Sequence, residues 1–324
     1  MTLRAAVGPA PEARPLLVVA IGGNALLHRG QAPDIEVQRA NVRDAAAVLA
    51  QLATDHRLVV THGNGPQVGL LARQSEALSG VAPVPFDVLA AESAGLIGYL
   101  LVEELSRHLG EAGASVVLTR VVVDAADPAF RAPSKPIGSM LTEGEAAALA
   151  AERGWSVAQD GDGWRRVVAS PAPLEIVERG AIELLEQAGN VVICAGGGGI
   201  PVARGSDGVL YGVEAVIDKD LTSAVVAEQL GAEALVILTD VDALYRGWGT
   251  PTRTAVRQAH PSELASEGWA SGSMGPKVAA ACRFAERTGR PARIGALADA
   301  AAVVRGQAGT EVSTRSPGAR SGTG

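Results

Sequence analysis

Lysine is the scarcest charged residue of this 324-residue chain, with three copies against 25 arginines. Each copy lies in a glycine- or aspartate-marked segment: Lys135 in PSKPIGS, Lys219 in AVIDKDLTS and Lys277 in GSMGPKV. A lysine supplies a compact, mobile point charge that a planar guanidinium does not imitate, and it is a common phosphate ligand. Chance retention at surface positions is the alternative. The glycine-rich settings favour phosphate chemistry.

Aromatic residues, cysteines and long apolar runs are also few. An aromatic content of 3% argues against stacking platforms for single-stranded nucleic acid, and a net charge of −7 without a basic stripe argues against binding a phosphate backbone. Cys194 and Cys282 lack the spacing of a metal or redox pair, which predicts buried thiols in a reducing cytoplasm. Neither a membrane-spanning run nor a signal peptide is apparent. We therefore expect a cytoplasmic protein without nucleic-acid or membrane partners.

Apolar runs alternate with segments of helical spacing along most of the chain. Strands are predicted at 18–21, 58–61, 115–123, 191–195 and 234–239, and helices at 35–54, 88–109, 172–188, 219–230 and 274–287. This alternation predicts an α/β fold with a mainly parallel sheet and helices on both faces. The proline- and turn-rich residues 127–168 interrupt it, which predicts a small projecting lid with its own hairpin. We expect residues 1–14 and 313–324 to be disordered tails.

Three predicted strands run directly into glycine turns: Gly22-Gly23-Asn24, His62-Gly63-Asn64-Gly65 and Gly196 to Gly199. Ligands of open α/β sheets bind beyond the carboxyl ends of the strands. Glycine lets backbone N–H groups approach an anion there, and a following helix N-terminus adds a favourable dipole. Any single turn is explained by the ordinary need for a positive φ angle. Three such turns favour an anion-lined cleft.

Familiar catalytic motifs are missing. Residues 196–199 are not a P-loop, the glycines near His62 miss G-x-G-x-x-G, and there is no G-x-S-x-G elbow. His62 is interpreted as a hydrogen-bonding turn residue. Phosphoryl transfer to an ionised oxygen needs no general base, only positioning and charge neutralisation. Lys219 and Lys277 are candidates for that charge and Asp220 for holding them, although Asp220 also suits an ordinary first helical turn.

Residues 236–245 have two interpretations from the sequence alone. The apolar run followed by Asp240-Val241-Asp242 is typical of a buried strand and a turn. It also suits a slot for a nucleotide base with Tyr245 at its floor. The pattern does not decide between them.

Together these segments resemble the carbamate kinases, a branch of the amino-acid-kinase family, over nearly all of residues 16–312. The most specific blocks are VVAIGGNALL, VVTHGNGPQVGLL, AGGGGIPV, GVEAVIDKDLTS, LTDVDALY and GSMGPKV. GVEAVIDKD together with HGNGPQVG separates this branch from the acetylglutamate, glutamate and aspartate kinases. Two departures are Ser139-Met140 in the lid and Glu92-Ser93-Ala94, which put the lid packing and the dimer or acceptor wall in question.

The resemblance implies a three-layer αβα sandwich and a homodimer. It implies an acceptor-binding lobe at 15–215 that includes the lid at about 127–168, and a nucleotide-binding lobe at 216–312. The implied activity is reversible, Mg²⁺-dependent phosphoryl transfer between ATP and carbamate, giving ADP and carbamoyl phosphate. We expect it to run toward ATP in arginine or purine-derivative catabolism. An amino-acid kinase with another carboxylate acceptor and a non-catalytic nucleotide sensor are the alternatives.

Residue roles also follow from the resemblance. Lys219 and Lys277 would neutralise the migrating phosphoryl group, Asp220 would orient both, and Lys135 would reach it from the lid. The acceptor and phosphoryl cleft would be lined by Gly22, Gly23, Asn24, Gly63, Asn64, Gly65, Gly196 and Gly197. The nucleotide would be held by Thr239, Asp240, Val241, Asp242, Leu244, Tyr245, Met274, Gly275 and Pro276. Mg²⁺ would ride on the nucleotide phosphates without a protein cage.

Overall fold

The computed structural model of the chain describes residues 14–23, 26–27, 31, 34–78, 80–110, 113–269 and 274–315. An eight-stranded sheet with the order β15-β17-β16-β12-β1-β2-β9-β3 runs through its middle. In that order the strands are Gln258–Ala259, Thr310–Val312, Ala292–Ala296, Ala234–Thr239, Leu16–Ile21, Arg57–His62, Val191–Cys194 and Ala114–Val117. All neighbouring strands run parallel except β16 and β17. The predicted mainly parallel sheet is confirmed.

Strand β1 lies in the middle of this sheet, and all six of its residues are buried. Val18 and Ala20 pack into one apolar cluster, while Leu17 and Val19 pack into a second cluster on the opposite face. A strand that is covered on both faces has no solvent side, so its sequence is a continuous apolar run instead of an alternating one. This burial explains why LLVVAI is readable as a strand from the sequence.

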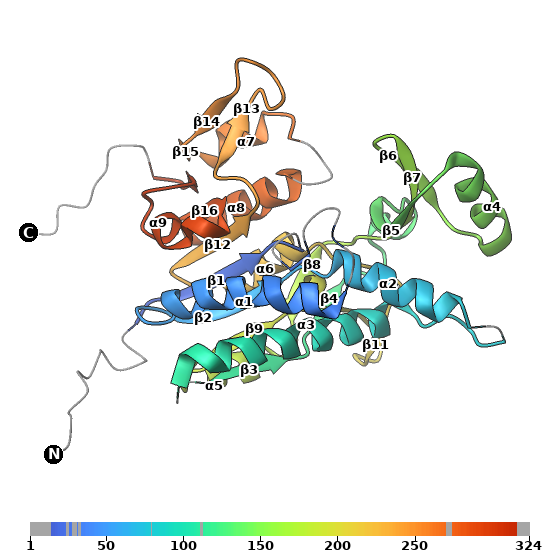
Figure 1. Cartoon of the computed structure of the whole chain (residues 1–324), viewed down its shortest axis with the longest axis horizontal. Coiled ribbons are helices and arrows are strands. Elements are labelled where there is room, and N and C mark those ends of the chain that lie inside the picture. Colours follow the sequence, from blue (N-terminus) through green and yellow to red (C-terminus); the bar gives the residue numbers. More distant parts are fainter. Residues whose placement is uncertain are drawn as a thin grey trace, which may run out of the picture.

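Helices cover both faces of the sheet (Figure 1). One face carries α1 (Ile35–Leu52), α3 (Phe86–Leu109) and α9 (Ala300–Val304). The other face carries α5 (Arg179–Gln187), α6 (Lys219–Gln229) and α8 (Met274–Thr288). The predicted αβα sandwich is confirmed.

A four-stranded sheet in the order β11-β10-β4-β8 corrects two predicted segments. Its strands are Leu210–Gly212, Ile200–Arg204, Arg120–Val123 and Pro173–Ile176. The helix predicted at 172–188 is wrong for Pro173–Ile176, because these residues pair with β4 and only the later ones form α5. Likewise, the extended stretch predicted at 115–123 divides at Leu118 between β3 and β4, which belong to different sheets.

Residues 127–168, called the lid segment from here on, project beside α2 (Gly65–Glu76) in Figure 1. They contain η4 (Pro128–Phe130), β5 (Lys135–Leu141), α4 (Glu143–Arg153), β6 (Val157–Asp160) and β7 (Gly163–Val168). The strands form a separate sheet in the order β5-β7-β6. Thr142 and Glu145 close a capping box at the start of α4, which satisfies backbone N–H groups that a helix start leaves unpaired.

The chain after β12 adds a hairpin of β13 (Leu244–Arg246) and β14 (Thr254–Val256), followed by α7 (Pro261–Ala265) and, before α9, by η6 (Leu297–Asp299). In Figure 1 this hairpin and α7 lie together beyond the sheet. Both cysteines are free; Cys194 is buried and Cys282 half-buried. Among the described residues, no helix is long and apolar enough to cross a membrane. Most of both predicted tails, residues 1–13 and 316–324, lies outside the described residues.

Candidate active site

The first two glycine turns meet at the carboxyl ends of β1 and β2. The Gly63 N–H donates to the Ile21 carbonyl at 3.1 Å, and the Gly22 N–H donates to Leu238 of β12 at 3.0 Å. A Cβ atom added to Gly63 would lie 2.8 Å from the Gly23 nitrogen. No side chain fits in that space, so glycine at 63 is required by close backbone approach. Asn24, predicted to line this cleft, lies outside the described residues.

The third turn joins the second through Asn64. Gly197 has φ +68° in η5 (Gly196–Gly198), and a Cβ atom added to it would lie 2.0 Å from Nδ2 of Asn64. The same Nδ2 donates to Oγ of Ser93 on α3 at 2.7 Å. Gly63, Asn64 and Gly197 therefore form one continuous wall, as expected from three turns at neighbouring strand ends. Ser93 is buried and falls within the ESA segment noted as a departure.

Asp220 holds two of the three lysines. Lys219 Nζ donates to its Oδ1 at 2.5 Å, and Lys277 Nζ donates to its Oδ2 at 3.1 Å. The side chains of Lys219, Asp220 and Lys277 are only 12%, 4% and 13% exposed. Two ammonium groups thus share one carboxylate at low exposure, where an anion would meet a net positive charge.

The positions of these three residues follow from helix starts. Asp218 is the N-cap of α6, and its Oδ1 accepts from the N–H groups of Asp220 and Leu221 at 2.9 and 3.2 Å. Lys219 and Asp220 therefore occupy the first turn of α6. Lys277 is the fourth residue of α8, after Met274, Gly275 and Pro276. Both helix N-termini add favourable dipole for an anion.

The pKa values in this cluster respond to burial and to charge. Desolvation lowers the pKa of Lys219, and the Lys277 ammonium lowers it further, while Asp220 opposes both effects. Burial by itself raises the pKa of Asp220, but the charges and hydrogen bonds of the two lysines outweigh it and hold the pKa below its ordinary value. Asp220 is therefore an ionised partner of the lysines and not a proton donor.

His62 ends β2 and is fully buried beside the third glycine turn. Its Nδ1 lies 3.1 Å from the carbonyl oxygen of Gly63, so Nδ1 carries the proton. Nε2 has no hydrogen-bond partner in the described part of the chain, and a Cβ atom on Gly196 would lie 2.5 Å from it. Desolvation, helped by the charge of Lys219, lowers the pKa of His62 to about 4. The imidazole is thus neutral and adds no charge to the lysine cluster.

Hydroxyl side chains that the sequence did not single out fasten α6 to the strand ends. Thr61 and Ser223 share a 2.6 Å hydrogen bond, and Ser223 Oγ donates to the Lys219 carbonyl at 2.6 Å. Thr222 Oγ1 donates to the Gly198 carbonyl at 2.9 Å. The only sequence signal was the polar pair Thr-Ser directly after Lys-Asp-Leu, on a face that turns out to be buried.

Lys135, at the start of β5, does not reach Asp220 by a hydrogen bond. Its Nζ donates to Oδ2 of Asp218 at 3.0 Å and to the Ile217 carbonyl at 3.3 Å. The lid lysine is therefore seated at the same helix start as Lys219, on the neighbouring aspartate.

The segment expected to hold a nucleotide follows β12, next to β1. Thr239 Oγ1 donates to Asp240 Oδ1 at 3.1 Å, and the Tyr245 hydroxyl donates to Asp242 at 3.0 Å. The Tyr245 ring centroid lies 5.6 Å from that of Trp248. A base slot at Tyr245 stays a prediction.

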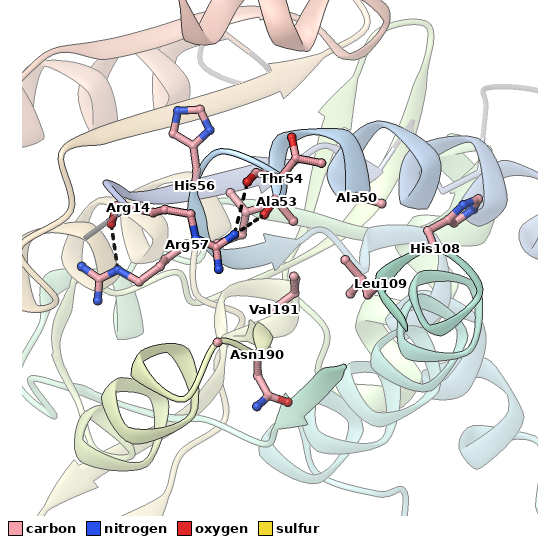
Figure 2. A pocket seen from close by; sticks show the side chains of 12 residues that line it. Arg14, Ala50, Ala53, Thr54, His56, Arg57, His108, Leu109, Asn190 and Val191 are labelled. Atoms are coloured by element: carbon pink, nitrogen blue, oxygen red, sulfur yellow. Dashed lines mark hydrogen bonds between the residues drawn. The ribbon is translucent and has the colours of Figure 1, made fainter. Parts of the chain in front are cut away.

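A hollow of about 160 Å³ lies at the opposite, amino edge of the sheet (Figure 2). It is lined by the ends of helices and the beginnings of strands, including Arg14, His56, Arg57, His108 and Asn190. Arg14 and Arg57 are already engaged there: Arg14 Nη1 donates to the Ala53 carbonyl, and Arg57 pairs with buried Glu186. The lysine cluster, at the carboxyl edge, is the stronger candidate for an active site.

The model of the amino acid kinase family matches residues 15–296. The chain belongs to the amino acid kinase family. Within it, the chain is 50% identical over 301 residues to a protein of Rhizobium meliloti named carbamate kinase, covering 92% of this chain and 93% of that one. A protein of Escherichia coli K12 with the same name is 52% identical over 297 residues, covering 92% and 99%. The structure of the carbamate kinase from Giardia lamblia bound to AMP-PNP matches with a TM-score of 0.85 at 38% identity, over 93% of this chain and 99% of that one.

Proposed function

We propose that the chain is a carbamate kinase that transfers a phosphoryl group reversibly between ATP and carbamate. The observation that carries the proposal is the Asp220 carboxylate with Lys219 and Lys277 on its two oxygens, at the start of α6 and beside α8. Relatives that share half of the sequence and carry this name support the choice of acceptor.

The proposed transfer needs no general base. Carbamate is already an anion, so its oxygen attacks the γ-phosphorus of ATP directly while the bond to the ADP oxygen breaks. Lys219 and Lys277 offset negative charge that spreads over the three equatorial oxygens, and Asp220 fixes both ammonium groups in advance. The imidazole of His62 is neutral, and the glycine turns carry no side chains, so a small anionic acceptor can approach the backbone at the strand ends.

Mg²⁺ would supply further charge neutralisation when it is bound to the nucleotide phosphates. The described residues contain no group of three or more histidine, cysteine or acidic side chains that could hold a metal ion. The two lysines and the helix N-termini fit phosphate oxygens, and Mg²⁺ commonly binds through substrate phosphates and water.

We assign the acceptor to the lobe of residues 15–215 with its lid segment, and the nucleotide to residues 216–312. The glycine turns belong to the first lobe and Thr239 to Tyr245 to the second.

We further propose a cytoplasmic homodimer that works toward ATP synthesis. Edge strand β3 and α3 support the dimer, because Leu96, Tyr99, Val116 and Leu118 are all exposed there, Tyr99 by 55%.

The function is tested by the rate of ATP formation from carbamoyl phosphate and ADP, measured in a coupled assay with and without Mg²⁺. We expect turnover that depends on Mg²⁺ and on carbamoyl phosphate. In the reverse direction, carbamate should outperform acetylglutamate, glutamate and aspartate when they are offered side by side. Folded protein that turns over none of these substrates, or that prefers one of the amino acids, contradicts the proposal.

A further inference from the structure

Asp218 is shared between two parts of the molecule that are distant in sequence. Its Oδ1 caps α6 by accepting from the N–H groups of Asp220 and Leu221. Its Oδ2 accepts from Lys135 Nζ of the lid segment at 3.0 Å, 83 residues earlier in the chain. The side chains of Asp218 and Lys135 are 19% and 25% exposed, so the ion pair is largely shielded from water.

The seat for Lys135 is rigid on the side of α6. The Ile217 carbonyl, which also accepts from Lys135 Nζ, lies against the third glycine turn, where a Cβ atom on Gly198 would be 2.4 Å from the Ile217 oxygen. The backbone carbonyl of Asp218 accepts from both the N–H and the hydroxyl of Thr222. The Ile217 carbonyl and the Asp218 carboxylate are therefore held in place by contacts that do not involve Lys135.

The lid segment is anchored elsewhere to α2. Arg166 of β7 donates to Glu76 at 2.7 Å, and Gly69 of α2 lies against Gly138 of β5. These contacts place β5, and with it the backbone of Lys135, on the acceptor side, but they do not by themselves fix the Lys135 ammonium. Lysine has several rotatable bonds and no fixed fork, so its ammonium needs a partner to stay in one place.

We propose that Asp218 is a positioning residue that holds the lid lysine, Lys135, beside the start of α6, so that the helix cap and the seating of the lid depend on one carboxylate. The inference rests on the proposed function and adds to it a residue outside the cluster of Lys219, Asp220 and Lys277. Without the carboxylate, Lys135 would face the positive end of α6 with the Ile217 carbonyl as its remaining acceptor there, and its ammonium would turn away.

Asp218→Asn separates the two tasks, because asparagine caps a helix as well as aspartate does but carries no charge. We expect Asp218→Asn to lower kcat by roughly 10-fold and Lys135→Met by roughly 100-fold, with the KM for ADP unchanged. The double variant should be no slower than Lys135→Met alone, because both changes remove the same placement. Asp207→Asn is the matched control: Asp207 accepts the Val209 N–H in a surface turn. It should retain wild-type kcat.

Hydrogen exchange across residues 135–141 provides a readout that does not depend on turnover. Asp218→Asn and Lys135→Met should each speed exchange in β5 to the same degree, without further increase in the double variant. Wild-type kcat in Asp218→Asn, or effects of the two changes that multiply, would overturn the role of Asp218. Failure of the wild-type protein to make ATP would overturn the proposed function instead, and the exchange experiment would still test the seat.

Discussion

Lys277 lies 57 residues beyond Asp220, yet its ammonium binds the second oxygen of the carboxylate whose first oxygen binds Lys219. The packing of α6 against α8 creates this relationship, because both lysines are on the first turns of their helices. A carboxylate with one ammonium on each oxygen cannot rotate without breaking a contact. The pair of positive charges is therefore oriented before any substrate binds.

Lys219→Arg tests whether shape matters as well as charge. The guanidinium is planar and larger than an ammonium, and Lys219 has only 12% exposure to accommodate it. We expect the rate of ATP formation to fall about 100-fold or more, as for loss of one contact that stabilises transferring charge. Steady-state kinetics on carbamoyl phosphate and ADP measure it. Arg287→Lys, at an exposed position on α8, is the control and should leave this rate unchanged. A wild-type rate in Lys219→Arg would mean that Lys219 does not face the phosphoryl group.

Asp220→Asn should cost stability as well as activity. The substitution keeps the side-chain shape but removes the negative charge that the Lys219 and Lys277 ammonium groups share, and removing one partner of a buried pair typically costs about 3–5 kcal/mol. Urea unfolding at neutral pH would measure the loss. Asp218→Asn, two residues earlier at a side chain that is 19% exposed, should cost far less. Equal stability of Asp220→Asn and the wild type would show that the lysines have other sufficient partners.

The sequence predicted the parts of the fold that depend on local pattern. Strand β1 was readable because its burial on both faces produces an uninterrupted apolar run. The glycine turns were readable because glycine marks close backbone approach. Pro173–Ile176 was misassigned because its apolar spacing also suits a helix, and only pairing of Ile176 with Val121 of β4 decides for a strand. That pairing joins residues far apart in the sequence.

The candidate site was predicted less completely. The scarcity of lysine pointed to Lys135, Lys219 and Lys277. The sequence around each lysine does not indicate that Lys277 binds Asp220 while Lys135 binds Asp218. Asp218 looked like an ordinary helix cap, and its contact with the lid segment arises from tertiary packing alone. Only the three-dimensional structure shows that Asp218 accepts from Lys135 and that Asp220 accepts from Lys219 and Lys277.

The buried imidazole of His62 should make stability depend on pH. Burial lowers its pKa to about 4, whereas the unfolded residue titrates near 6.5. Between these values the unfolded chain binds a proton that the folded chain refuses, so stability falls as the pH falls through 6.5 toward 4. At pH 5 the contribution is about 2 kcal/mol.

Urea unfolding at pH 7.5 and pH 5 measures this effect in the wild type and in His62→Gln. Removing the imidazole should shrink the loss between the two pH values by about 2 kcal/mol, whatever it does to stability at pH 7.5. His108→Gln, which removes an exposed imidazole at the end of α3, serves as the control and should retain the full wild-type loss. The same pH dependence in His62→Gln and the wild type would refute the assignment.

Gly69→Ala tests the attachment of the lid segment to α2. Alanine is favoured over glycine inside a helix by about 1 kcal/mol, but its Cβ would lie 2.8 Å from Cα of Gly138. Since that neighbour is backbone, no side-chain rotation relieves the contact, and β5 has to move. We expect a net loss of about 1–3 kcal/mol in the free energy of unfolding together with a lower kcat, because Lys135 starts the same strand.

Gly180→Ala in α5, where nothing lies within 4 Å of the added Cβ atom, should instead keep full activity and gain up to about 1 kcal/mol in the free energy of unfolding. Should Gly69→Ala gain stability like Gly180→Ala and keep its kcat, the lid segment would not be fixed through this contact.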